Sequence, residues 1–124
     1  MPINMSEFES YKPRYNQKKM NKFSEKINIE LKDKAIIIAI EELSELVCAT
    51  SKWVRFNCSS RQKNGRDRRE KDRLNVLEEL ADATIAINII RDKACITQDD
   101  LNQMIAYKLD KKFNILNSNR MTRR

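Results

Sequence analysis

The sequence predicts an all-α protein, an antiparallel helical bundle completed by homo-oligomerisation. The first observation is that 124 residues contain one glycine and two prolines, too few for the tight turns of a sandwich or barrel. The second is that apolar residues recur at helical spacing along three long stretches. The length suits one domain, and these helices expose more apolar surface than one copy covers. We therefore expect a homodimer or a dimer of dimers.

The first helical stretch follows a tail. Residues 1–23 mix aromatic and basic side chains without a sustained period, so we expect a basic, flexible N-terminal tail. Helical character begins near Phe23, and one long helix is predicted over 33–56. Its aliphatic side chains recur at steps of three, four and seven residues: Ile36, Ile40, Leu43, Val47 and Val54.

Two further helices follow a basic loop predicted over 57–72. The helix over 72–93 is apolar on nearly every side, which favours a central position. Thr97 and Asp100 have the spacing of a capping box, and they open a third helix that runs to about Asn117. One face of that helix is apolar: Leu101, Ile105, Leu109, Phe113 and Leu116. The domain is thus expected over 24–118, with a C-terminal tail over 119–124.

Composition restricts the chemistry. The chain has 25 Lys plus Arg against 18 Asp plus Glu, a net charge of +7, and no histidine. The absence of histidine removes Ser/His and Cys/His nucleophile systems and most zinc sites. Three cysteines without Cys-x-x-Cys spacing predict neither a disulfide framework nor a zinc knuckle, which favours a cytoplasmic location. No apolar leader and no run of about 18 apolar residues is present, so we expect no membrane association.

Two acidic clusters interrupt apolar stripes of the first two long helices. They are Glu41, Glu42 and Glu45, then Glu78, Glu79 and Asp82. Glu42 and Glu45 share a helix face, as do Glu79 and Asp82, and no Lys or Arg stands three or four residues from any of these four. Carboxylates gathered between helices lose hydration and repel unless a cation compensates. A ligand set of carboxylate oxygens alone favours Mg²⁺ or Mn²⁺. The alternative to a metal site is that these acids pair with cationic side chains of other helices.

The order Glu41-Glu42-Leu43-Ser44-Glu45, then Glu79-Leu80-Ala81-Asp82, resembles the Glu-Glu-x-x-Glu and Glu-x-x-Asp motifs of MazG-like proteins. These belong to the all-α nucleoside triphosphate pyrophosphohydrolases. The resemblance covers roughly residues 30–115. It implies Mg²⁺-dependent hydrolysis of a nucleoside triphosphate between its α and β phosphates, giving a monophosphate and pyrophosphate.

The resemblance also implies roles for individual residues. The metal ligands would be Glu42, Glu45, Glu79 and Asp82. Glu41 and Glu42 would be the catalytic acids, with Glu41 orienting water or supporting the ligands. Three lysines would contact the substrate phosphates: Lys52, seven residues after Glu45, and Lys108 and Lys112, four residues apart on one helix face.

Two other interpretations stay open. A small basic helical protein could bind nucleic acid through its arginine- and lysine-rich loop, whose cations are Arg61, Lys63, Arg66, Arg68, Arg69, Lys71 and Arg73. The second interpretation is a helical module that has no catalytic activity and serves only for assembly. Whichever function holds, the predicted homodimer or dimer of dimers is expected to bury the apolar segments 36–40 and 85–90.

Overall fold

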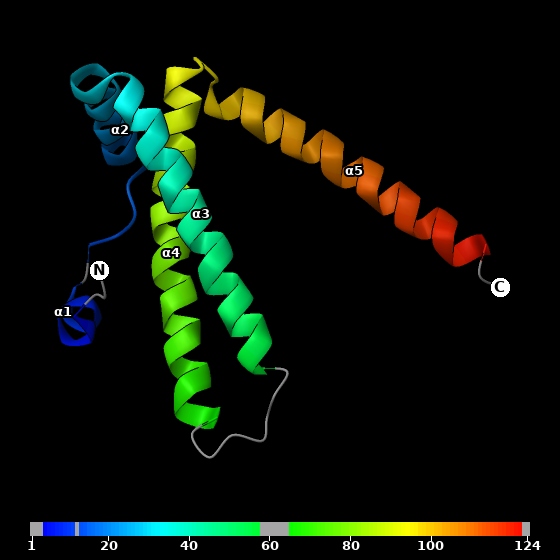
Figure 1. Ribbon diagram of the computed structural model, residues 1–124. Helices are drawn as coiled ribbons and strands as arrows, with labels where there is room; N and C mark the ends of the chain where they lie inside the picture. Colours follow the sequence, from blue (N-terminus) through cyan, green and yellow to red (C-terminus); the bar gives the residue numbers. More distant parts are fainter. Residues whose placement is uncertain (1–3, 12, 58–64, 123–124) are drawn as a thin grey trace. The chain divides into compact units, whose positions relative to one another are not determined.

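The computed structural model describes residues 4–11, 13–57 and 65–122, with side chains at all of these except 56–57, 65–68 and 120–122. It contains α1 (Met5–Ser10), α2 (Gln17–Leu31), α3 (Asp33–Asn57), α4 (Gly65–Lys93) and α5 (Gln98–Thr122), shown in Figure 1. The described residues form no strand, which confirms the all-α prediction. Two compact units, Met1–Lys93 and Ala94–Arg124, are each described by themselves.

The first unit is built on an antiparallel pair of helices, α3 and α4, against which α2 also packs (Figure 1). Small side chains form most of its buried apolar core: Ala35, Ala39, Ala49, Ala83, Ala86 and Ile89. Small side chains at a contact allow helix axes to approach closely. The first buried residue of α3, Ala35, donates its backbone N–H to Lys32 at 3.2 Å, where the chain turns between α2 and α3 with φ of 49°.

A buried polar network joins α2 to α4. Asn88 is 4% exposed and donates to the hydroxyl of the fully buried Ser24 at 2.6 Å. The side-chain oxygen of Asn88 accepts from Gln17 at 3.1 Å and from Arg91 at 2.5 Å. One turn further along, Asn28 donates to the backbone carbonyl of Ile89 at 3.0 Å. Because buried polar groups are costly without partners, this network fixes how α2 docks on α4.

Replacement of Asn88 by alanine is expected to destabilise the first unit by about 2–3 kcal/mol, because it removes three hydrogen bonds and leaves the buried Ser24 hydroxyl without its donor. The matched control is Thr84→Ala, one turn earlier on α4, where an exposed hydroxyl donates to the carbonyl of Leu80 in the same helix. That control is expected to change stability by less than about 0.5 kcal/mol. Urea unfolding followed by circular dichroism measures both. Equal effects would show that the network contributes nothing specific.

The N-terminal boundary differs from the prediction. α2 begins at Gln17, so the start predicted near Phe23 is wrong, and residues 17–23 belong to the packed unit rather than to a tail. Asn16 caps this helix by accepting from the backbone N–H groups of Lys18 and Lys19 at 3.0 and 3.3 Å. The first turns contact α4 through polar side chains such as Gln17, which donates to Asn88, and such contacts leave no apolar period in the sequence.

The predicted loop 57–72 is also too long, because α4 begins at Gly65. Lys, Arg and Glu are good helix formers even without an apolar face, and Glu70 and Arg73 pair one turn apart at 3.0 Å. The remainder of the predicted loop, residues 58–64, lies outside the described residues.

In the second unit, α5 opens as predicted. The backbone N–H of Asp100 donates to the Thr97 hydroxyl at 3.1 Å, and the Thr97 N–H donates to the Asp100 carboxylate at 3.4 Å. This capping box is therefore confirmed. The helix continues past the predicted end at Asn117 to Thr122, so most of the predicted tail 119–124 is helical.

Candidate metal centre

Three carboxylates from two helices meet in the first unit. Glu42 and Glu45 lie one turn apart on α3, and Glu79 lies on α4. One carboxylate oxygen from each residue lies within 4.8 Å of the others. Glu42 and Glu79 are half-buried while Glu45 is exposed. The cluster is therefore closed by the helix pair on one side and open to water on the other.

The packing of α3 on α4 explains this convergence. On α3, Glu42 shares the inward face with the buried Ala35, Ala39 and Ala49. On α4, Glu79 lies one turn before the buried Ala83. The acids therefore occupy positions of the apolar stripes through which the two helices pack, as the sequence predicts.

The electrostatics of the cluster are unfavourable in the absence of a cation. Burial raises the pKa of Glu42, and the neighbouring charges of Glu45 and Asp82 raise it further. Burial also raises the pKa of Glu79, followed by the charges of Glu45, Asp82, Glu42 and Glu78. One carboxylate oxygen of Glu42 and one of Glu79 are buried and have no hydrogen-bond partner in the described part of the chain. Such atoms are costly to leave unpaired, and a divalent cation would satisfy them.

The other predicted site residues are placed less closely. Asp82 is half-buried and acts on the pKa of both Glu42 and Glu79, but it lies outside the group of converging oxygens. Glu41 and Lys52 are exposed on α3. The structure thus brings together three of the four predicted metal ligands, with the fourth close enough to influence their charge.

The two remaining lysines belong to the second unit. Lys108 and Lys112 are exposed on α5, four residues apart and so on one face. Their assignment to the substrate phosphates stays a prediction.

One buried acid was not identified from the sequence. Asp72, taken there as the end of a loop, lies within α4 and has a buried carboxylate oxygen without a hydrogen-bond partner in the described residues. It precedes Glu79 by seven residues, two helical turns, and so shares its face. That spacing is the signal that could have revealed it, since the helix predicted over 72–93 already contains both residues.

Only part of the basic segment 61–73 belongs to the residues that the structure describes. Arg66, Arg68, Arg69, Lys71 and Arg73 lie on α4, while Arg61 and Lys63 are outside the described residues. The pairing of Arg73 with Glu70 lowers the pKa of that carboxyl group. Part of the positive charge of this segment is therefore neutralised locally.

The unliganded protein is expected to lose stability as the pH rises through the raised pKa values of Glu42 and Glu79. Above the ordinary value of 4.5 the unfolded chain releases these protons first, so the folded state binds more protons and stability falls with pH. At pH 7 in EDTA, the double variant Glu42→Gln/Glu79→Gln should be more stable than the wild type by about 1 kcal/mol, a figure reduced by the open side of the cluster.

That stability difference should disappear near about pH 4, where the carboxyl groups are neutral in both states. Urea unfolding across this pH range measures the effect. Glu30→Gln, which replaces an exposed acid on α2, is the control and should leave the profile unchanged. A double variant whose profile follows the wild type would contradict the assigned pKa directions.

Comparisons of the chain with protein-family models, curated proteins and solved structures found no match. A search of the described helices for a segment long and apolar enough to cross a bilayer also found none. The case for a function therefore depends on the residues of the site.

Proposed function

We propose that the protein is a Mg²⁺-dependent nucleoside triphosphate pyrophosphohydrolase, with Mn²⁺ as an alternative metal. The observation that carries the proposal is the convergence of Glu42, Glu45 and Glu79 from two facing helices. Two of them have a buried oxygen without a hydrogen-bond partner among the described residues. The order of the acids along the chain resembles the paired motifs of MazG-like proteins, as noted above. An oxygen-only donor set fits Mg²⁺, which binds few carboxylates and retains water and phosphate ligands.

In this proposal Glu42, Glu45 and Glu79 hold the metal, and Asp82 completes the acidic environment. A bound divalent cation supplies charge neutralisation at the phosphate oxygens and lowers the pKa of a bound water. The reaction adds one water across the α–β phosphoanhydride bond and releases a nucleoside monophosphate and pyrophosphate. Phosphoryl transfer depends mainly on positioning and charge stabilisation. The acids would contribute by holding the metal that neutralises the phosphate charge, so no covalent nucleophile is required.

The remaining residues would bind and orient. Glu41 is exposed beside Glu42, and its carboxylate would accept a hydrogen bond from the attacking water. Lys52, Lys108 and Lys112 would bind phosphate oxygens as point charges. A homodimer would form the functional unit.

Phosphorus NMR of nucleoside triphosphates incubated with the protein and Mg²⁺ tests the proposal. A panel of ribo- and deoxynucleotides should yield monophosphate and pyrophosphate, and EDTA should abolish the products. Diphosphate and orthophosphate would indicate cleavage of the other anhydride bond and refute the assigned reaction. No turnover of any nucleotide by folded protein would refute the enzymatic function.

Nucleic-acid binding is the second candidate, and one observation favours it. The first turns of α4 carry part of the basic run rather than a loop, and the described cations Arg69 and Arg73, four residues apart, share a face. Binding that falls steeply with salt and is unaffected by Glu42→Gln would support this function. Such a result together with no nucleotide turnover would favour it over the enzyme.

A further inference from the structure

The outward side of α3 carries an uncharged stripe, which we call the α3 seam. Its residues recur at alternating steps of three and four, the heptad spacing of a coiled-coil face: Ile37, Ile40, Ser44, Val47, Ser51 and Val54. All six are exposed, with Val47 65% and Ile40 55% accessible. The chain as a whole is 35% charged, so a run of six uncharged positions on an exposed face requires an explanation.

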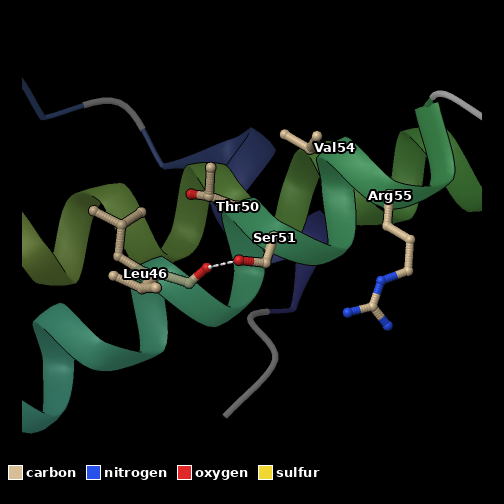
Figure 2. Close-up of a pocket in the computed structure, with 6 residues that line it drawn as sticks. Leu46, Thr50, Ser51, Val54 and Arg55 are labelled. Carbon is tan, nitrogen blue, oxygen red and sulfur yellow. Dashed lines mark hydrogen bonds between the residues drawn. The ribbon is translucent and has the colours of Figure 1, made fainter.

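The polar atoms of the α3 seam are already satisfied within the helix. The Ser44 hydroxyl donates to the carbonyl of Ile40 at 2.9 Å. The Ser51 hydroxyl donates to the carbonyl of Val47 at 2.8 Å, and Figure 2 shows this second bond. Burial of a hydroxyl is costly when it loses its partner. Neither serine would lose its partner on burial, because each hydroxyl bonds within its own helix. The α3 seam can therefore be covered without creating an unpaired donor.

The α3 seam is complementary to itself when two copies run antiparallel. With a two-fold axis between Ser44 and Val47, each Ser44 faces a Val47 of the second copy, and each Ile40 faces a Ser51. Large side chains then meet small ones in the central layers, as knobs-into-holes packing requires. A two-fold axis makes such a surface isologous, so one patch serves both copies.

The shape of the α3 surface is consistent with this antiparallel register. A hollow of about 560 Å³ lies over the C-terminal half of the seam, lined by Leu46, Val47, Thr50, Ser51, Val54 and Arg55 (Figure 2). In the antiparallel register this half faces Ile37 and Ile40 of the second copy. Four half-exposed aliphatic side chains and two serines offer roughly 500 Å² per copy, so a pair would bury roughly 1,000 Å², which reaches the lower bound of a specific interface.

We propose that the α3 seam is a homodimer interface in which two copies of α3 pack antiparallel about a two-fold axis between Ser44 and Val47. The proposal does not depend on the enzymatic function, because none of the six residues is an assigned ligand or catalytic group. The partner that covers the α3 seam is a second copy of this chain, because an unrelated partner would not require the seam to be complementary to itself in size and spacing.

Sedimentation equilibrium of the full chain tests the proposal. At about 100 μM, above a micromolar dissociation constant, the wild type should have twice the chain mass of 14.7 kDa. Val47→Asp should weaken association at least about tenfold, because it places an unpaired charge in an apolar interface. The matched control Ile29→Asp replaces an equally exposed aliphatic side chain on α2, 66% accessible, and should leave the dimer intact.

A mixing experiment tests the register. Ser44→Lys alone should also dissociate the dimer, whereas an equimolar mixture with Val47→Asp should restore it, because the introduced lysine and aspartate face each other in the heterodimer. Restoration also shows that both variants are folded. A monomeric wild type, a dimer insensitive to Val47→Asp, or a mixture that stays monomeric would each overturn the proposed interface.

Discussion

Glu79→Gln is expected to lower kcat for nucleoside triphosphate hydrolysis by about 1,000-fold or more, equivalent to about 4 kcal/mol of transition-state stabilisation. Glutamine preserves the size of the side chain but removes the negative charge that would hold the metal. Glu79 converges with Glu42 and Glu45 within 4.8 Å, so the loss of one charge weakens the whole ligand set. Glu42→Gln should have a similar effect, since its oxygen is also buried and unpartnered.

The chain offers a matched control for this prediction. Glu78→Gln makes the same chemical change at the preceding residue of α4, which lies about 100° around the helix and outside the converging group. It should change kcat by less than about threefold, because the half-buried Glu78 carboxylate is not among the oxygens that would hold the metal. Initial rates of pyrophosphate release at saturating Mg²⁺ measure both variants. Equal losses in Glu78→Gln and Glu79→Gln would show that the cluster has no special role in turnover.

The second large effect is stabilisation by divalent cations. If Mg²⁺ binds the folded protein alone, a concentration about 100 times Kd adds about 2.7 kcal/mol to the free energy of unfolding. For a chain of 124 residues this corresponds to a rise in Tm of roughly 10 °C. The gain is expected because a cation neutralises the like charges around Glu42 and Glu79 and satisfies their buried oxygens.

Thermal unfolding in MgCl₂, MnCl₂ and NaCl of equal ionic strength measures this stabilisation. NaCl should reproduce only the screening component. The double variant Glu42→Gln/Glu79→Gln should lose the Mg²⁺ response while keeping its own higher stability in EDTA. A wild-type Tm that does not respond to Mg²⁺, or a variant that responds equally, would mean that the cluster does not bind the ion.

Much of the fold was predictable because helix-forming patterns are local. The stretch now seen as α3 was predicted almost residue for residue, and the Thr97–Asp100 capping box is present with both of its hydrogen bonds. The two helix starts that were predicted too late have a common cause. Both the start of α2 and the first turns of α4 lack an apolar period, the former because it docks through polar groups such as Gln17 and the latter because it is rich in charged helix formers.

The two acidic motifs were also predictable from the sequence. Helical spacing alone places Glu42 and Glu45 on one face of α3, and it places Glu79 and Asp82 on one face of α4. The sequence does not predict which carboxylate oxygens converge. Helix spacing fixes angles around one axis, but the distance between side chains of different helices depends on the axial register of α3 against α4. That register brings a carboxylate oxygen of Glu79 within 4.8 Å of those of the α3 acids and leaves Asp82 outside the group.

Each of the two apolar segments expected to be shared between copies is partly covered by the chain's own helices. Within residues 85–90, Ala86 and Ile89 are buried while Ile87 is 48% exposed. Within residues 36–40, Ala39 is buried while Ile37 and Ile40 stay exposed. The amino-acid sequence by itself determined the helical class, the capping of α5 and the candidate acids, because these depend on residues within a few turns of each other. The tertiary structure decided which acids meet and which apolar faces remain open, because burial depends on the neighbouring helix as much as on the residue.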